Sequence, residues 1–468
     1  MTRGFPRPDL MQWLLVLSGC IVIVACLVMV VVPYLRGTAD LLTTWSLFLL
    51  GLANFLGVSA IQSGTAENHL YGIFGTSEYW RFALGSIVFV IAVSLAYYKF
   101  TWPRRLAHRR MPKWPPVTVG AMCGAIVFCC ILTFAGIQAP NVQFVGQILI
   151  FLGGAASNYA AAFGFYIWDE RRFNPVAVSL LGGTVALGLF ASIGQGSGRI
   201  YLLTTLLTVP FCWYWKTARY KRLRSLILPM SVGLVVTVFL IAGYSAVRHA
   251  RRDPNAGLAE LAIARLKAIP EGFQKGKSVV LGGDTTDVSL LAIQRYTQIA
   301  EPQPFYTLVY VISNPIPRAW WPGKIGSLGE TLPREAGIWS RFGYVSLGPG
   351  IIGHGYHEGG LHMIVFYGLL IGWALRFIDE LLVTRSHNPF IVGMIASVGG
   401  FFFALPRGEL GLYMIHIIAG FLTGFILNLI CRMLFGTIDH RAVAYADPAA
   451  MTDDEHVRAA EQEYPAWR

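Results

Sequence analysis

The chain has 468 residues, of which 55% are hydrophobic and only 13% are charged. Soluble domains carry about 25% charged residues, so this composition excludes an ordinary soluble protein and indicates an α-helical integral membrane protein. The net charge of +12 fits Lys and Arg in cytoplasmic loops and is poor evidence for nucleic-acid binding. The seven cysteines lie in or beside apolar segments, which argues against a disulfide framework and a thiolate metal site.

Apolar runs of about 20 residues recur along the chain, and each can cross a hydrocarbon core of about 30 Å. They predict an all-α, polytopic fold with about eleven (ten to twelve) transmembrane helices. In chain order the runs are 11–33, 41–62, 82–98, 117–138, 145–168, 176–193, 200–215, 226–247, 361–377, 390–405 and 410–430.

These runs divide the chain into four parts. Residues 1–247 hold the first eight predicted helices, 248–346 form one large polar loop, 347–435 re-enter the membrane with three more helices, and 436–468 form a polar tail. Within the loop, we expect surface helices at 248–277, a short amphipathic turn at 289–295, and a rigid segment rich in Pro, Trp and Gly at 316–329.

Lys and Arg gather in the loops 99–113, 171–172 and 216–224. Because short loops rich in these residues stay in the cytoplasm, helix parity places the large loop on the outer, periplasmic face. The tail then lies in the cytoplasm, whereas the basic N-terminus falls outside, against the same rule. Either hydropathy misses a helix near 63–81, or later loops control how the first helix pair inserts.

Three arginines stand beside Gly or Pro at the predicted outer face. They are Arg199, which opens a predicted helix, Arg318 in the large loop, and Arg407 in a tight reversal between two helices. Arginines at helix ends are commonly interfacial anchors, which is the simpler interpretation of each one. Planar guanidinium groups on one face also suit a diphosphate, because they bind phosphate oxygens in pairs. We therefore hypothesise that the three arginines bind a diphosphate.

A second constellation precedes the predicted helix 361–377. The run Gly-His-Gly-Tyr-His-Glu-Gly-Gly at 353–360 holds His354, His357 and Glu358. This spacing differs from a His-Glu-x-x-His zinc helix, and its glycines discourage one, so we predict no metal site. A histidine or a carboxyl with a shifted pKa can act as a general base. The alternative is a glycine-rich start of a helix with polar capping residues.

The segment 305–324, with its Pro-Arg-x-x-Trp-Pro-Gly-Lys core, resembles the bacterial oligosaccharide repeat-unit polymerases (O-antigen polymerases, Wzy type). So do Ser-Gly-Arg at 197–199, Gly-x-Gly-Tyr at 353–356 and Arg-Gly-Glu at 407–409. His357, followed eleven positions later by Gly368, is similar to the histidine motif of O-antigen ligases, which share this fold. His354 and Glu358 stand where the polymerases more usually have a carboxylate and an amide, which leaves the identity of the base open.

The resemblance implies a GT-C-like fold and a metal-independent glycosyltransferase, without a cofactor, in the bacterial inner membrane. The donor would be a polyprenyl-diphosphate-linked oligosaccharide, and the acceptor another lipid-linked repeat unit of an O-antigen or exopolysaccharide. The predicted arginines would neutralise the leaving diphosphate. One of the residues of 353–360 named above would take the acceptor's proton, and we favour His354 because its flanking glycines present it freely. Further candidate contacts to sugar or the membrane interface are Trp320, Trp321, Tyr356, Arg341 and Glu409.

Expected partners are membrane lipids, a chain-length regulator and a flippase, and no nucleic acid. The first alternative function is an O-antigen-ligase-like enzyme, which runs the same chemistry toward a different acceptor. The second alternative is a polysaccharide transporter. It is less favoured because transporters place polar residues at the membrane midplane, whereas here the predicted polar residues gather at one face.

Overall fold

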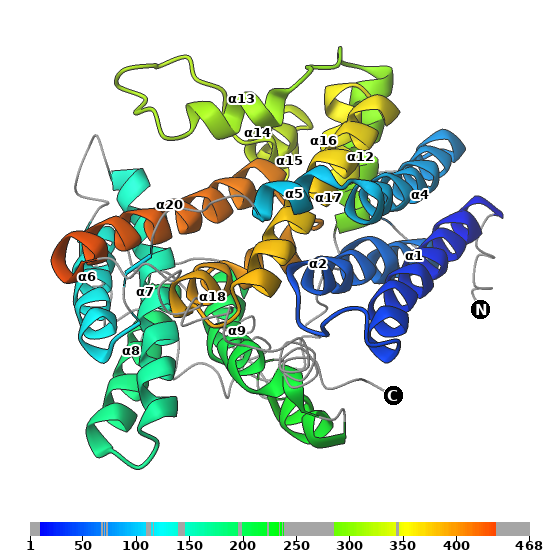
Figure 1. Cartoon of the computed structure of the whole chain (residues 1–468). Helices are drawn as coiled ribbons and strands as arrows, with labels where there is room; N and C mark the ends of the chain where they lie inside the picture. Colours follow the sequence, from blue (N-terminus) through cyan, green and yellow to red (C-terminus); the bar gives the residue numbers. More distant parts are fainter. Residues whose placement is uncertain are drawn as a thin grey trace, which may run out of the picture.

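The computed structural model describes residues 10–436, except 67–68, 70, 72–73, 109–113, 116, 139–145, 195–198, 222–223, 234, 236, 238–284 and 343–345. Within this part of the chain every regular element is a helix (Figure 1). Eight helical stretches there are long and apolar enough to cross a membrane. They are α1 (Leu10–Leu35), α2–η1–α3 (Thr44–Leu52, Ala53–Val58, Ser59–Thr65), α4 (Thr76–Lys99), α6 (Val119–Gln138), α7 (Gly146–Glu170), α8 (Pro175–Gly194), α17 (Leu361–Thr384) and α20 (Leu410–Phe435).

The other three predicted runs differ from simple spans. The run 200–215 is helix α9 (Arg199–Lys216), whose terminal charges and threonines lower its hydropathy. The run 226–247 is described only in part. The run 390–405 is broken into α18 (Pro389–Ala396) and α19 (Gly399–Ala404). The described residues between α3 and α4 form no additional helix, so they do not supply the missing span considered near 63–81.

The break between α18 and α19 frees backbone carbonyls inside the bundle. Two neighbouring helices satisfy them: Asn158 Nδ2 of α7 donates to the Ser397 carbonyl at 3.1 Å, and Thr208 Oγ1 of α9 donates to the Ala396 carbonyl at 3.4 Å. A broken helix is tolerated in a membrane bundle only where such partners exist. The interruption is therefore supported by the surrounding structure.

A buried carboxylate fixes the start of α2. Asp379, near the end of α17, accepts the backbone N–H groups of Thr44 at 2.8 Å and Trp45 at 3.1 Å. It also accepts the hydroxyls of Thr44 at 2.7 Å and Tyr97 at 2.8 Å. The first N–H groups of a helix have no partner within that helix, and the helix dipole favours an anion beside them. Asp379 thus ties α2, α4 and α17 together at one end of the bundle.

The described part of the large loop is helical and packs onto the bundle. Its helices are α12 (Thr285–Gln298), α13 (Tyr306–Ser313), α14 (Leu328–Glu335) and α15 (Ile338–Phe342), followed by α16 (Gly350–Glu358). Figure 1 shows α12 and α16 side by side, with α13 and α14 over the start of α20. The expected surface helices at 248–277 lie outside the described residues, as do the N-terminal nine residues and nearly all of the tail.

One expectation for this loop is wrong. The segment 289–295 was expected to be a short turn, but it is the middle of the 14-residue helix α12. This helix is buried because its polar residues find partners in the bundle, with Thr286 N–H donating to Ser59 Oγ at 3.0 Å and Ser63 Oγ donating to Asp287 at 2.5 Å.

Beyond the loop, most of the glycine-rich segment 353–360 lies in helix α16, although its glycines were expected to discourage a zinc-binding helix. In α16, Gly353 and Gly355 allow close packing against Pro349 and Ile364.

Loops that were predicted to share a membrane face contact one another. Arg219, beyond α9, pairs with Asp40 at 3.2 Å, and Arg104 of helix α5 (Trp102–Ala107) pairs with Glu380 of α17 at 4.0 Å. We call this end of the bundle the inner end, and the end covered by α12–α16 the outer end. These names follow the charge-based prediction of topology, in which the large loop lies outside.

This topology predicts which positions an impermeant thiol reagent reaches in intact cells. Gly323→Cys, in an exposed turn of the outer loop where an added side chain meets open space, should be labelled without permeabilisation. Arg171→Cys, exposed between α7 and α8, should be labelled only after permeabilisation. Labelling of the seven native cysteines is measured in unsubstituted protein and subtracted. The reverse pattern would invert the topology.

Candidate functional site

Helix α16 carries the three predicted catalytic residues, and all of them are buried. His354, His357 and Glu358 are 0%, 1% and 0% exposed. Their helix packs between α12 and α17, and it ends at Gly359 and Gly360, whose φ angles of 153° and 71° suit glycine. The structure therefore brings these residues together on adjacent turns, inside the protein rather than in an open groove.

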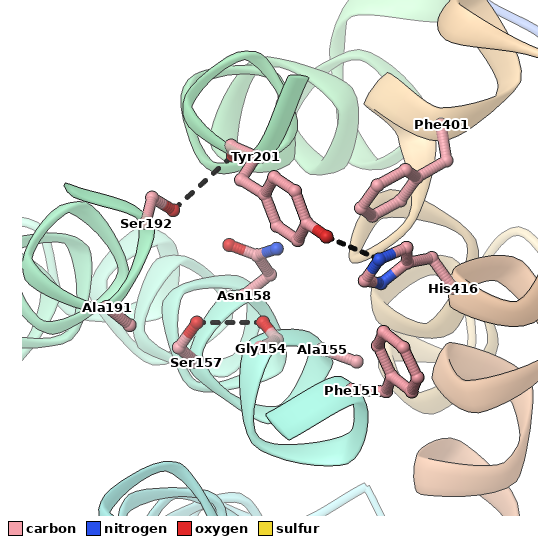
Figure 2. A pocket seen from close by; sticks show the side chains of 10 residues that line it. All are labelled: Phe151, Gly154, Ala155, Ser157, Asn158, Ala191, Ser192, Tyr201, Phe401 and His416. Atoms are coloured by element: carbon pink, nitrogen blue, oxygen red, sulfur yellow. Dashed lines mark hydrogen bonds between the residues drawn. The ribbon is translucent and has the colours of Figure 1, made fainter. Parts of the chain in front are cut away.

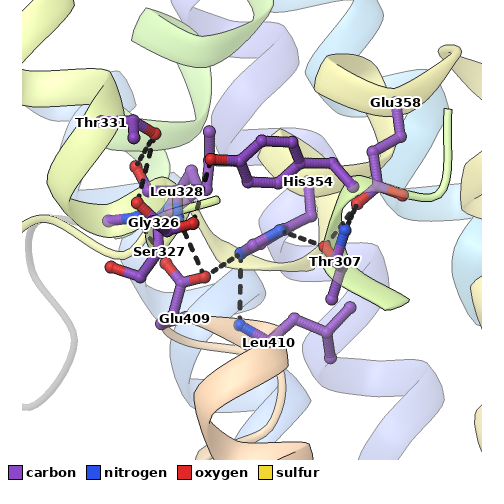
Figure 3. A network of polar contacts seen from close by, with 12 residues as sticks. Thr307, Gly326, Ser327, Leu328, Thr331, His354, Glu358, Glu409 and Leu410 are labelled. Atoms are coloured by element: carbon purple, nitrogen blue, oxygen red, sulfur yellow. Dashed lines mark hydrogen bonds and ion pairs between the residues drawn. The ribbon is translucent and has the colours of Figure 1, made fainter. Parts of the chain in front are cut away.

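His354 uses both ring nitrogens in hydrogen bonds (Figure 3). The Leu410 N–H, at the start of α20, donates to Nε2 at 3.2 Å, so Nε2 is an acceptor. The proton is then assigned to Nδ1, which donates to Thr307 Oγ1 at 2.8 Å. Burial lowers the pKa of His354 to about 3, chiefly by penalising the charged form. His354 is thus a neutral bridge between α13 and α20, and it could act as a base only by releasing Leu410.

Glu358 closes the same network at the start of α13. Its carboxylate accepts the Thr307 N–H at 3.0 Å, the Thr307 hydroxyl, and the Tyr367 hydroxyl at 2.6 Å. Burial raises the pKa of Glu358, while these hydrogen bonds oppose the shift. Because both oxygens are engaged, Glu358 orients its neighbours, and through Thr307 it orients His354.

His357 differs from the other two in its hydrogen bonding. Its Nδ1 atom is buried and has no hydrogen-bond partner among the described residues. The ring lies between Tyr296 of α12 and Tyr306 of α13, in edge-on contacts with both. The distances between ring centres are 4.2 Å to Tyr296 and 4.7 Å to Tyr306. Burial lowers the pKa of His357 to about 4, so the imidazole is neutral at pH 7 and can accept a proton. Of the three candidates, His357 alone has a buried nitrogen without a partner.

Glu409, predicted to contact sugar or the interface, instead joins the loop to the bundle. It precedes α20 and accepts the N–H groups of Leu328, at 3.2 Å, and Gly329, the first two residues of α14. Its Oε1 lies 3.8 Å from His354 Nε2. Burial raises the pKa of Glu409 to about 7, although the two N–H groups favour its carboxylate. A side chain of the Arg-Gly-Glu motif thus holds α14 in place.

Arg407 extends into the bundle. Its guanidinium lies 5.5 Å from the centre of the Phe55 ring. Phe55 belongs to the π-helix η1 and stands eleven residues (55 − 44) into the 22-residue stretch Thr44–Thr65. Beside it, Asn54 Nδ2 is buried and lacks a hydrogen-bond partner among the described residues. π-helical turns are frequent at functional sites, and a charge beside the middle of a predicted span is costly, so we predict a role for Arg407 beyond interfacial anchoring.

The other predicted arginines have different surroundings. Arg318 is exposed and donates to the Lys324 carbonyl at 3.3 Å. Lys324 is buried and closes its loop by donating to the carbonyls of Asn314 at 2.8 Å and Ile316 at 2.7 Å. No contact described here joins Arg318 to Arg407. Arg199 opens α9, as predicted.

The remaining predicted contacts separate into exposed and buried groups. Trp320 and Trp321 are 72% and 45% exposed, as expected of side chains at a membrane interface. Tyr356 is buried and donates to the Arg81 carbonyl at 2.9 Å, which ties α16 to α4. The side chain of Arg341, in α15, lies outside the described residues.

Sequence reasoning missed a polar cluster inside the bundle (Figure 2). His416 of α20 pairs with the Tyr201 hydroxyl of α9, and its ring stacks on Phe401 at 4.5 Å. Nearby, Thr205 donates to Asn158 at 2.8 Å. Each of these polar residues lies in an otherwise apolar run of the sequence. The only feature of the sequence that indicated the cluster is therefore an ionisable residue, His416, within a predicted membrane span.

A further outer cluster was also missed. His69 Nδ1 lies 3.0 Å from Asp287 of α12, and its Nε2 lies 2.7 Å from the Tyr79 hydroxyl of α4. Among the residues that the structure describes, no group of three or more His, Cys, Asp or Glu side chains is arranged to hold a metal ion.

No protein-family model, curated protein or solved structure matches the chain. The family resemblance therefore stays a prediction.

The burial of His354 predicts a pH dependence of stability. Its folded pKa of about 3 lies below the ordinary 6.5, so its contribution is complete above about pH 6.5 and is lost as the pH falls toward 3. When the pH falls from 7.5 to 5, the free energy of unfolding of the His354→Gln protein should therefore decrease by about 2 kcal/mol less than that of the parent protein. Denaturant unfolding in detergent at several pH values measures this difference.

Glu409 changes the stability of the fold in the opposite direction over part of the same pH range. Its folded pKa is raised from 4.5 to about 7, so its contribution is complete below about 4.5 and is lost as the pH rises through 7. Glu409 is present in both the parent and the His354→Gln protein. Where its pKa is the same in both, its contribution cancels, and the difference between the two pH profiles is due to His354. Identical pH profiles for both proteins would show that His354 is not held neutral by the fold.

Proposed function

We propose that this protein is a metal-independent glycosyltransferase that joins polyprenyl-diphosphate-linked oligosaccharide repeat units at the outer face of the bacterial inner membrane. The observation that carries the proposal is the position of Arg407. A guanidinium at mid-helix depth can meet a diphosphate whose polyprenyl chain stays in the bilayer. The neighbouring Asn54 amide offers a further donor.

The base in this proposal is His357, in place of His354, which was favoured from the sequence. The acceptor hydroxyl oxygen attacks the anomeric carbon, and the bond from that carbon to the diphosphate oxygen breaks. The bonding electron pair leaves on polyprenyl diphosphate, whose charge Arg407 stabilises. The hydroxyl proton passes to His357 Nδ1, which has no partner to displace. Since His357 is 1% exposed, the contacts of Tyr296 and Tyr306 must open to admit substrate.

A second candidate function is transport of a lipid-linked glycan. The broken helix α18–α19 and the deep charge of Arg407 are features that transporters share. The enzyme is favoured because the outer loop carries a buried acid–base network that transport does not require. A ligase-like enzyme would use the same site, and it is distinguished by its acceptor.

The first test concerns Arg407. Arg407→Ala should lower turnover of purified protein with a lipid-linked donor by about 10²-fold or more, because the leaving group loses its counter-charge. Arg407→Lys should recover little, since an ammonium does not reproduce the two-pronged contact. Arg334→Ala, at an exposed position of α14, is the matched control. Near-parental turnover in Arg407→Ala, with a folded protein, would return Arg407 to an anchoring role.

The second test ranks the candidate bases. His357→Gln should reduce turnover by about 10²–10⁴-fold with little change in melting temperature, because His357 donates and accepts no described hydrogen bond through Nδ1. His354→Gln and Glu358→Gln should lower both turnover and melting temperature, since each breaks a buried network. All assays include EDTA, which should leave turnover unchanged. Full activity of His357→Gln would exclude it as the base.

A further inference from the structure

A large cavity lies at the inner end of the bundle, far from α16. Its volume is about 740 Å³, which is within the usual range for small-molecule sites. Its walls come from the α1–α2 turn, the ends of α4 and α17, helix α5, and the 3₁₀ turn η3 (Ala218–Tyr220). Its acidic and basic lining residues are Asp40, Arg104, His108, Arg219, Arg376, Asp379, Glu380 and His387.

Three guanidinium groups and three carboxylates line this cavity, but they are not paired one to one. Glu380 faces two arginines, Arg376 one helical turn away in a close ion pair and Arg104 at 4.0 Å. Asp40 pairs with Arg219, at 3.2 Å. Arg376 and Arg104 therefore share a single carboxylate.

The third carboxylate, Asp379, has its hydrogen bonds elsewhere. Both of its oxygens accept N–H or O–H groups from Thr44, Trp45 and Tyr97, at distances from 2.7 to 3.1 Å. Asp379 is thus directed at the start of α2, where the helix dipole favours its negative charge. His387 adds a further ring that can donate a hydrogen bond to an anion, whereas His108 Nδ1 already donates to the Arg104 carbonyl at 2.8 Å.

The guanidinium of Arg376 is positioned by an aromatic contact as well as by its ion pair with Glu380. This group lies 5.3 Å from the centre of the Tyr97 ring, and Tyr97 itself stacks on Trp45 at 4.2 Å. The Arg376 side chain is 28% exposed and that of Arg104 is 65% exposed, so both reach solvent while sharing Glu380. Two guanidinium groups that share one carboxylate keep N–H donors for another oxyanion.

We propose that this inner cavity binds the phosphate group of an anionic ligand, with Arg376 and Arg104 as its principal contacts. Guanidinium forks match the oxygens of a phosphate, and two guanidinium groups that share one carboxylate keep N–H donors for it. The ligand can be a free phosphate compound or the headgroup of an anionic lipid, because the two share this chemistry. The proposal does not depend on the glycosyltransferase function, since it concerns the other end of the bundle and requires no turnover.

The test uses the purified full-length protein in neutral detergent. In one arm, inorganic diphosphate is titrated by isothermal calorimetry at constant ionic strength. In the other arm, protein reconstituted with phosphatidylglycerol and phosphatidylcholine is released into the gas phase, and retained lipid is identified by native mass spectrometry. Variants are Arg376→Gln and Arg104→Gln, and Arg171→Gln is the control with the same charge change in another predicted cytoplasmic loop.

At least one arm should show binding to the parent protein. Arg376→Gln and Arg104→Gln should each weaken this binding by about tenfold or more, and the control Arg171→Gln should leave it unchanged. Loss of diphosphate binding identifies a free phosphate compound, and loss of retained phosphatidylglycerol identifies a lipid headgroup. Arg104→Gln keeps the test valid if Arg376→Gln fails to fold, because the Arg104 side chain is 65% exposed. No binding in either arm, or binding equal in cavity variants and control, would overturn the proposal.

Discussion

Three buried carboxylates hold helices that are far apart in the chain, and each does so through backbone N–H groups in the first turn of another helix. Asp379 binds the start of α2, Glu358 the start of α13, and Glu409 the start of α14. An unpaired N–H inside a bundle costs free energy, and so does an isolated buried carboxylate. Bringing them together reduces both costs and adds a favourable interaction with the helix dipole. The position of the outer loop depends on two of these three contacts.

The turn before α20 links that loop to the bundle through three residues that are close together in the sequence. Arg407 points toward Phe55, Glu409 holds α14, and the Leu410 N–H holds His354 of α16. A displacement of α14 would therefore be transmitted to the backbone that positions Arg407. In the proposed enzyme this turn couples the leaving-group site to the acid–base network, because both depend on the same few residues.

Local patterns and long-range contacts differed in how well sequence predicted them. Eight of the predicted apolar runs are long helices, because hydropathy over about 20 residues is a local property. The break at Ser397 depends on Asn158, 239 positions away, and Asp379 finds its partners 335 positions away, so no local pattern reports either. Sequence placed His354, His357 and Glu358 together but could not predict their burial or Glu409 as the cap of α14. The inner cavity was missed because its walls come from separate loops.

The unpaired atoms of the outer half indicate where a ligand would contribute most. Leaving a buried polar group without a partner costs about 1–3 kcal/mol. His354 and Glu358 have partners for every described acceptor and donor role, whereas His357 Nδ1 and Asn54 Nδ2 have none. A ligand that supplies hydrogen bonds at these two atoms would recover that cost on binding. In the proposed enzyme, His357 Nδ1 would take the proton of the acceptor hydroxyl and Asn54 Nδ2 would donate to the diphosphate, so each atom would serve one substrate of the glycosyl transfer.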